Sequence, residues 1–347
     1  MMKITAKLFF AALALGLMIW TLINPVESQS AANDLRAVFT TQAPTLDGKS
    51  DAVWQGAPVL TIRTSGGANT GKHLLRVKAL YDSNRVYFLF QWNDPTESLA
   101  FFPWEKQADG SWKKLSSADD DEQKFAEDKI ALLWAINAPT FIQEGCMYAC
   151  HLGDGGKAYG NMIAGKGELL DMWHWKAARS NPVGHADDQY LDDTAWAKER
   201  PNAGRKSDPL NGGGYKDNVN QDKTAPAVMP ATGGVKPQKP QRNWVLAAES
   251  VPFTDSFKTG DRVGGVIVSP FAGDRGDLTA KGVWSKGQWT VEISRPLVTG
   301  SKFDVQFNDL KAGYHFAPAV FDNAEVKHSF TMQTYRLVFA PKKPAQK

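Results

Sequence analysis

The sequence predicts an all-β protein built as a two-layer sandwich, interrupted by an insertion that contains loops and a short helix. Residues 74–81 alternate between apolar and charged side chains, as a half-buried strand does. Residues 86–92 are aromatic and β-branched, as a fully buried strand is, and the turn at residues 82–84 joins the two into a hairpin. Residues 288–294 alternate strictly near the other end of the chain. Many short strands with few helices are typical of a sandwich.

Ten segments carry this strand pattern, on both sides of a stretch that lacks it. In chain order we expect strands at residues 59–63, 74–81, 86–92, 129–136, 262–269, 277–284, 288–294, 303–307, 314–321 and 331–339. Residues 33–43 are expected to form an extended lead-in, and residues 94–128 an irregular, charged connection. The acidic residues 119–122 in this connection lack the ligand spacing of a calcium loop and are interpreted as solvated.

The composition is that of a globular protein with ample material for a core. The chain has 347 residues, of which 42% are hydrophobic and 22% charged, and its net charge is +3. A charge this close to neutral, without a basic run, argues against nucleic acid as a partner. The 12 tryptophans and 18 phenylalanines can line a cofactor cleft, although they also fill cores.

The amino terminus has the pattern of an export signal. Lys3 and Lys7 precede an uncharged apolar run at residues 8–23, and small residues follow. This run is longer than most signal cores and shorter than the ~20 residues that span a bilayer. We therefore expect residues 1–32 to be a cleaved signal peptide or a retained membrane anchor. Residues 33–347 would form one domain outside the cytoplasm, in the periplasm, either free or tethered to the inner membrane by residues 8–23.

The strand pattern stops between residues 141 and 200, and we expect an insertion there at one end of the sandwich. Glycines are frequent in this stretch, and residues 169–179 can form a short helix. Residues 201–243 are rich in Gly, Pro, Asn and Lys without an apolar period, which predicts a long flexible surface loop. Loops on a rigid sandwich commonly carry the functional site.

The only two cysteines, Cys146 and Cys150, lie in this insertion with three residues between them, and His151 follows directly. Two thiols on one short turn can bond to the vinyl groups of a haem, and the histidine can ligate its iron. The usual attachment signature, C-x-x-C-H, is one residue shorter. Three other interpretations stay open: a disulfide, which persists in an exported chain, a zinc site that would need a fourth ligand, and two unrelated buried thiols.

A haem held by His151 has a second axial position, and several residues are candidates for it. Met172 and His174 alternate with Trp173 and Trp175, whose indoles would form an apolar pocket wall. The alternative is that both indoles pack in the core and His174 is hydrogen-bonded there. The remaining candidates are Met162, His185, His315 and His328, whereas His73 is expected to be uninvolved.

Several motifs together resemble those of the haem-binding domain related to ethylbenzene dehydrogenase, also described as the cytochrome c-552/dimethyl-sulfoxide-reductase-like haem-binding domain. The resemblance covers about residues 40–340. The motifs that carry it are residues 45–54, 145–151, 171–179, 287–297 and 321–323.

The resemblance implies a β-sandwich that carries one haem and passes electrons outside the cytoplasm. Some relatives are small subunits of molybdenum oxidoreductases, and they hold a b-type haem between a methionine and a lysine from the loop that here comprises residues 325–328. This chain differs, because it has the C-x-x-x-C-H stretch of c-type relatives and a histidine at the end of that loop. A c-type haem on Cys146 and Cys150 is therefore expected, with His151 as one ligand. His328 is the first choice for the second ligand, and Met172 or His174 the next.

The resemblance also implies a redox partner, either a molybdenum oxidoreductase subunit or another cytochrome. No nucleophile elbow, zinc-protease helix or phosphate loop is present in the sequence, so we expect an electron carrier or redox subunit rather than an enzyme. The expected fold is an immunoglobulin-like or carbohydrate-binding-like sandwich, and the latter class begins with a similar D-G…W pattern. The alternative function is thus a non-redox module that binds a carbohydrate or another ligand, with a Cys146–Cys150 disulfide.

Overall fold

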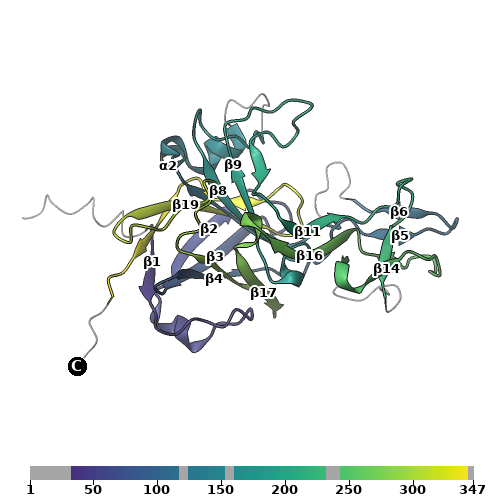
Figure 1. Cartoon of the computed structure of the whole chain (residues 1–347), viewed down its shortest axis with the longest axis horizontal. Coiled ribbons are helices and arrows are strands. Elements are labelled where there is room, and N and C mark those ends of the chain that lie inside the picture. The colour runs from purple at the N-terminus through teal and green to yellow at the C-terminus, as the bar shows by residue number, and fades with distance from the viewer. Residues whose placement is uncertain (1–32, 117–123, 153–159, 232–242, 343–347) are drawn as a thin grey trace, which may run out of the picture.

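The computed structural model describes residues 33–116, 124–152, 160–231 and 243–342 of the chain. It confirms the expected all-β class: strands dominate these residues, and the one α-helix among them is short. Figure 1 shows a body of packed strands and an arm that projects from one side of it.

The body is a single sheet of 13 strands that folds over into two layers. Its strands are β1 (Asp34–Phe39), β2 (Leu60–Ser65), β3 (Lys72–Tyr81), β4 (Arg85–Asn93), β7 (Lys129–Ala135), β8 (Leu170–Lys176), β9 (Asp187–Leu191), β10 (Arg205–Ser207), β17 (Thr279–Ser285), β18 (Gln288–Pro296), β19 (Gly313–Phe321), β20 (Ser329–Phe330) and β21 (Tyr335–Phe339). One layer runs β10-β9-β8-β7-β19, and the other runs β2-β3-β4-β18-β17. The layers are joined by β20, which pairs with β19 and β2, and by β1, which runs parallel to both β21 and β3.

Aromatic side chains fill the space between the two layers. Trp173 on β8 packs edge-on against Phe88 on β4, with ring centroids 5.4 Å apart. Trp175 contacts Trp92 and Trp289 across the same gap, at 6.2 and 5.0 Å. All five rings are almost fully buried. Each such ring removes a large apolar area from water, so this cluster contributes strongly to the stability of the sandwich.

The arm consists of three small sheets from two distant stretches of the chain. They are formed by β5 (Trp104–Lys106), β6 (Trp112–Lys114) and β15 (Arg262–Val263), by β11 (Gly212–Asp217), β16 (Val266–Ala272) and β13 (Trp244–Leu246), and by β12 (Val228–Pro230) and β14 (Ser250–Pro252). β11 and β16 lie next to the body, and β5 and β6 lie farther out (Figure 1).

Helical segments are few and short. They are η1 (Ala52–Gly56), α2 (Pro139–Cys146), the π-helical turn η2 (Met147–Leu152), η3 (Asn181–Val183), η4 (Ala247–Glu249) and η5 (Asp274–Gly276). Asp47 and Gly48 form a bend that Glu292 of β18 holds to the body: its carboxylate accepts hydrogen bonds from the Asp47 and Gly48 amides and from the Trp54 indole.

Most of the strands expected from the sequence are confirmed, and four expectations are wrong. Residues 170–176 form β8 rather than a helix, because this segment lies inside the sheet with both faces covered. β8 and β9 are thus integral strands, and only part of the stretch 141–200 is an insertion. Residues 303–307 pair with no strand, and the stretches taken as irregular connections contain strands of the arm.

Two further expectations concern residues outside the described ranges: the apolar run at residues 8–23 and the acidic residues 119–122. Within the described ranges, no helix has the length and apolar character needed to cross a membrane.

Candidate functional site

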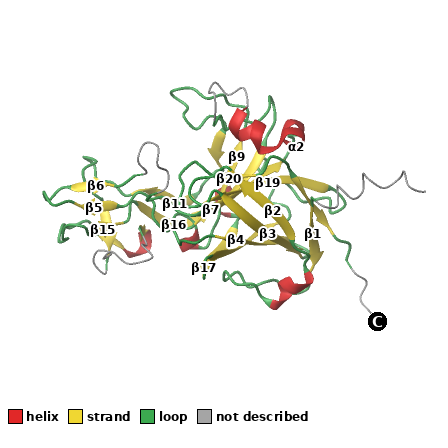
Figure 2. Cartoon of the chain, turned by 180° about the vertical axis from the view of Figure 1, so that it is seen from behind, coloured by secondary structure: helices red, strands yellow, loops and turns green. Residues whose placement is uncertain are grey.

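The candidate site lies on the outer face of the β8-β7-β19 layer, beneath α2 and η2. Successive side chains of a strand point to opposite faces. Trp173 and Trp175 therefore point into the sandwich, while Met172 and His174 point outward. Met172 belongs to a buried cluster with Cys146 and residues of α2 and η2. Figure 2 shows α2 beside β19, β20 and β9 at this end of the body.

A glycine allows α2 to deliver the cysteines to this face. The helix begins with Pro139, and Gly145 breaks it with φ 66° and ψ −164°. A Cβ atom at Gly145 would lie 2.5 Å from the carbonyl oxygen of Met332, so only glycine permits this close approach of the chain to the segment before β21. Cys146 follows the break, and η2 then carries Cys150 and His151.

The two cysteines lie side by side as free thiols. Cys146 is buried and Cys150 is half-buried. A hydrogen bond to the Cys150 thiol, together with burial, raises the pKa of Cys146 well above its usual value. The disulfide of the alternative interpretation is therefore not formed in this structure, while both sulfur atoms remain close together on one turn.

His151 and His328 meet at this site although 177 residues separate them in the sequence. Their ring centroids lie 5.1 Å apart, and the Phe330 ring stacks on His151 at 4.2 Å. Burial lowers the pKa of His151. Burial and the neighbouring His151 lower the pKa of His328 to about 4. Both imidazoles are thus neutral at neutral pH, which is the state that ligates a metal.

The hydrogen bond of His328 fixes which of its nitrogens carries a lone pair. Nδ1 lies 2.8 Å from the Val326 carbonyl oxygen, which can only accept, so Nδ1–H is the donor. The neutral ring then has its lone pair on Nε2. Metal-binding histidines commonly donate their other N–H to a carbonyl in this way. The loop is held in place by the amide of Ala68, which donates to Lys327 O at 2.9 Å.

His174 lies on the same face but next to different groups. Its ring is 5.3 Å from Phe321, whose ring is 4.8 Å from His328. Its Nδ1 is 3.3 Å from Arg205 Nη2, and its buried Nε2 has no hydrogen-bond partner among the described residues. Burial and the nearby Lys176 and Arg205 hold its pKa well below the usual value.

The strand register places a floor of small side chains between these groups. Ala131 of β7 pairs with Ala319 of β19 on one side and with His174 of β8 on the other. The next outward pair, Leu133 and Ala317, lies beside Met172. Small side chains on this face pack under α2, η2 and the rings of Phe321 and Phe330, whereas the inner face of the same strands carries large aromatic residues.

Cationic side chains at one end of the floor were not anticipated from the sequence. Lys129 is 2% exposed, pairs with Lys176 in the register and donates to Glu325 O at 2.9 Å. Its Nζ also lies 4.3 Å from the Phe321 ring centre. Burial and Arg179 hold the pKa of Lys129 well below its usual value. The sequence feature that could have indicated this buried cation is the lysine at the first position of an otherwise apolar strand.

The structure separates the other predicted residues from this site. Trp173 and Trp175 are wrong as a pocket wall, because the strand alternation turns both indoles into the core. The ring centroids of His185 and Phe271 lie 5.4 Å apart, near the base of the arm. His315 pairs with Arg336 at the opposite end of β19, and His73 bonds to Asn93 O as an uninvolved residue would. Met162 does join the site, since its amide donates to Cys150 O.

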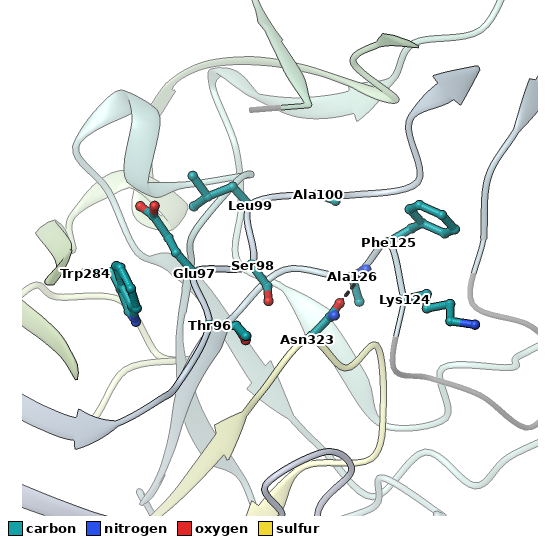
Figure 3. Close-up of a pocket in the computed structure, with 10 residues that line it drawn as sticks. All are labelled: Thr96, Glu97, Ser98, Leu99, Ala100, Lys124, Phe125, Ala126, Trp284 and Asn323. Carbon is teal, nitrogen blue, oxygen red and sulfur yellow. Dashed lines mark hydrogen bonds between the residues drawn. The ribbon is translucent and has the colours of Figure 1, made fainter. Parts of the chain in front are cut away.

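A separate surface pocket contains none of the predicted residues. It is lined by segments 96–100 and 124–126 together with Trp284 and Asn323, and Asn323 Oδ1 accepts a hydrogen bond from the Ala126 amide at 3.2 Å (Figure 3).

Comparison with known proteins decides the family. The ethylbenzene dehydrogenase family profile matches residues 51–332, which is most of the chain. The chain belongs to the ethylbenzene dehydrogenase family. The matched region includes Cys146, Cys150, His151 and His328, and also the complete arm. No curated protein matches the chain significantly.

Solved structures give only distant similarities. A family 9 carbohydrate-binding module from Caldicellulosiruptor kristjanssonii, in complex with cellotriose, is 10% identical with a TM-score of 0.34, and the match covers 90% of this chain and 100% of that one. A putative carbohydrate-binding protein from Bacteroides uniformis is 6% identical with a TM-score of 0.36, covering 89% and 99%. Similarities this low assign no ligand to the chain.

Proposed function

We propose that this chain is an extracytoplasmic electron-transfer protein that carries one haem, attached through Cys146 and Cys150. The observation that carries the proposal is the convergence of four residues from two distant segments on one face of the sheet. Cys146, Cys150 and His151 come from α2 and η2, and His328 comes from the loop before β20. The family match is compatible with a redox role.

The donor set fits a haem in three respects. The two cysteines are adjacent and form no disulfide in this structure, and thioether formation needs two such thiols. The imidazoles of His151 and His328 are neutral, and the Nε2 lone pair of His328 is available. The alanine floor between Met172 and Phe321 suits a flat group, and Phe330 covers one side.

Each side chain then has a distinct role. His151 and His328 would be the two axial ligands, with Met172 and His174 as the alternatives to His328. When bound, the haem supplies reversible one-electron chemistry. The apolar side chains would exclude water from it, and the guanidinium of Arg205 and the Lys129 amine would hold its carboxylates. The positive charge of Arg205 would disfavour an oxidised, more positive iron and so would raise the reduction potential.

The electrons would be exchanged with a second redox protein, either a molybdenum oxidoreductase subunit or a cytochrome. The export pattern of residues 1–32 supports an extracytoplasmic location, in the periplasm. We propose an electron carrier rather than an enzyme because both axial positions have a candidate ligand in the structure.

The double variant Cys146→Ser/Cys150→Ser tests the attachment. Both changes nearly preserve side-chain volume, so folding should be retained while thioether formation is lost. After export from a host that attaches c-type haem, the wild type should keep its haem on a denaturing gel and the double variant should not. Met147→Leu, between the two cysteines, is the matched control and should stain like the wild type. Equal covalent haem in the double variant would overturn the proposal.

A further inference from the structure

A second cluster of chemistry-bearing side chains lies inside the sandwich, on the other face of the strands that form the candidate site. Asp171 on β8, Asp188 on β9 and Asp304 are at most 1% exposed. Each offers a carboxylate oxygen, and these three oxygens lie within 4.8 Å of one another. Three carboxylates this close and this deeply buried repel one another strongly unless a positive charge or bound protons compensate them.

A fourth carboxylate outside this trio also points into the cluster. Asp208, directly after β10, is 3% exposed, and neither of its carboxylate oxygens has a hydrogen-bond partner among the described residues. It faces Asp304, because the closeness of this carboxylate adds to burial in raising the pKa of Asp208. A buried polar group without a partner costs free energy, so both oxygens of Asp208 favour a bound cation or a bound proton.

The unsatisfied oxygens are numerous. With the half-buried Asp277, the cluster contains eight carboxylate oxygens that lack a hydrogen-bond partner among the described residues: both oxygens of Asp188, Asp208 and Asp304, and Oδ1 of Asp171 and of Asp277. Asp171 uses its other oxygen fully, since Oδ2 accepts from Arg295, Trp173 and the Val305 amide.

Among the residues that the structure describes, one cationic side chain accompanies the five aspartates. Arg295 is fully buried, and its Nη1 lies 2.8 Å from Asp171 Oδ2 and 3.6 Å from Asp304 Oδ2. If all five carboxylates were ionised, the cluster would carry four net negative charges. A dication would remove half of that charge and provide a partner for the free oxygens.

We propose that Asp171, Asp188, Asp208 and Asp304, with Asp277 at the rim, bind one calcium ion inside the sandwich. The chemistry of the donors selects the metal. Calcium takes six to eight oxygen ligands with flexible geometry and accepts bidentate carboxylates, whereas zinc prefers nitrogen and sulfur ligands. Magnesium demands a near-ideal octahedron and keeps most of its water, which a buried all-carboxylate site does not offer.

The ion would tie together the strands that carry the candidate site. Asp171, Asp188 and Asp208 are next to Met172, Gln189 and Ser207 in sequence. Because neighbouring side chains point to opposite faces, a metal inside the sandwich would hold β8, β9 and β10 in register beneath the outward-facing residues. The inference does not depend on the haem, since none of the five aspartates lies on the outer face.

Bound protons are the competing way to compensate the charge. Burial and Asp304 raise the pKa of Asp208 to about 9, so in the absence of a metal this carboxyl group is protonated at neutral pH. In that case the cluster would be a network of shared protons and would have no affinity for calcium. A direct measurement of calcium binding distinguishes a metal site from a network of shared protons.

The test is a calorimetric titration of the folded, chelator-treated full chain with calcium chloride, and separately with magnesium chloride. We expect one calcium ion per chain, binding at least ~10-fold tighter than magnesium, and a rise in Tm of ~5 °C at saturating calcium. Asp188→Asn, which keeps the size of the side chain, should lower the calcium affinity at least ~10-fold. Asp217→Asn, an exposed aspartate on β11, is the control and should bind like the wild type.

A wild-type chain that is folded but binds no calcium would overturn the proposal, as would magnesium binding of equal strength. Unchanged affinity in Asp188→Asn would overturn the assignment of the site. If this variant does not fold, Asp208→Asn is the second variant, and the wild-type titration remains decisive by itself.

Discussion

At the scale of single residues, the two faces of β8 line two chemically different environments: the inside of the sandwich and the candidate site on its outer face. Its inward side chains are Asp171, Trp173 and Trp175, and its outward side chains include Met172 and His174. The sequence motif 171–179 shows these residues as one polar and aromatic run, and it does not reveal which faces which side. The assignment of Trp173 and Trp175 to a pocket wall fails for this reason, because adjacency in a strand means opposite faces.

The second haem ligand is testable by single substitutions. The ring centroids of His328 and His151 lie 5.1 Å apart. The His174 ring instead packs against Phe321, whose ring packs against His328. In the haem-loaded protein, His328→Ala should therefore change the visible absorption spectrum more than His174→Ala does. Spectra of both variants in the reduced and oxidised states provide the measurement. The reverse order would move the axial ligand to β8.

Asp94 provides a pH-dependent prediction. Burial and Asp322 raise its pKa to about 7, so the folded state keeps this proton while the unfolded carboxyl group loses it near pH 4. A raised acid pKa means that the folded state binds more protons between pH 4 and 7, so this group lowers stability as the pH rises through that window.

Asp94→Asn should remove that loss, because asparagine resembles the protonated acid and can still accept from the Thr96 amide. Relative to the wild type, the variant should gain about 2 kcal/mol of unfolding free energy between pH 5 and pH 8. Urea denaturation of both proteins at the two pH values, in the presence of a chelator, measures the difference. A variant effect that is the same at both pH values would show that Asp94 does not titrate in this range.

At the scale of elements, the strands with strong alternation follow from the sequence. β3 and β18 are expected within a few residues because their period-two pattern reflects burial on one face, and β4 and β19 because they are continuous apolar runs. β8 does not follow, since it is buried on both sides and contains Asp, His and Lys, residues that normally weaken a strand assignment. Its partners β7 and β9 supply the burial that the local sequence does not show.

The docking of α2 depends on one glycine and is a second element-scale prediction. In Gly145→Ala the new Cβ atom would strain the positive φ and collide with Met332 O at 2.5 Å. We expect a loss of about 3 kcal/mol in unfolding free energy and a reduced fraction of chains with covalent haem.

Gly110→Ala is the matched control, because Gly110 also has a positive φ, of 85°, and no atom lies within 4 Å of the new Cβ. It should cost about 1 kcal/mol and leave the haem content unchanged. Denaturant unfolding and haem staining of both variants are the measurements. Equal effects of the two substitutions would mean that contact with Met332 does not position the cysteines.

At the scale of the whole molecule, the chain combines a body predictable from the sequence with an arm that is not. The arm strands are two to seven residues long, and several come from segments rich in glycine, proline and asparagine. Apart from the local β5–β6 hairpin, their pairing is long-range, as between β5 and β15, and short-range periodicity carries no information about it. The contact between His151 and His328 likewise depends on the complete topology. The hydrophobic pattern of the sequence does not predict this contact, whereas the family resemblance led to the choice of His328.

The arm is organised around Asn218, which gives a whole-molecule prediction. This fully buried side chain donates to Val228 O and Gly264 O and accepts from the amides of Ala227 and Val228. Asn218→Ala leaves these groups unsatisfied and should destabilise the arm by about 2–4 kcal/mol while the sandwich stays folded.

Hydrogen exchange resolved by segment is the measurement for this variant. Protection should fall in β11, β12 and β16 and persist in β3, β4 and β18. Asn220→Ala is the control, because the half-buried Asn220 side chain bonds only to residues 224 and 225 of its own turn. A uniform loss of protection across the chain would show that the arm and the sandwich unfold as one unit.

The central claim, a haem bound covalently at Cys146 and Cys150, is tested most directly by a haem stain of a denaturing gel together with a pyridine haemochrome spectrum. The protein should be exported from a host that attaches c-type haem. We predict a stained band and the absorption shift of a c-type haem. A colourless protein with an intact Cys146–Cys150 disulfide would contradict the claim, and a haem that dissociates on denaturation would contradict its covalent part.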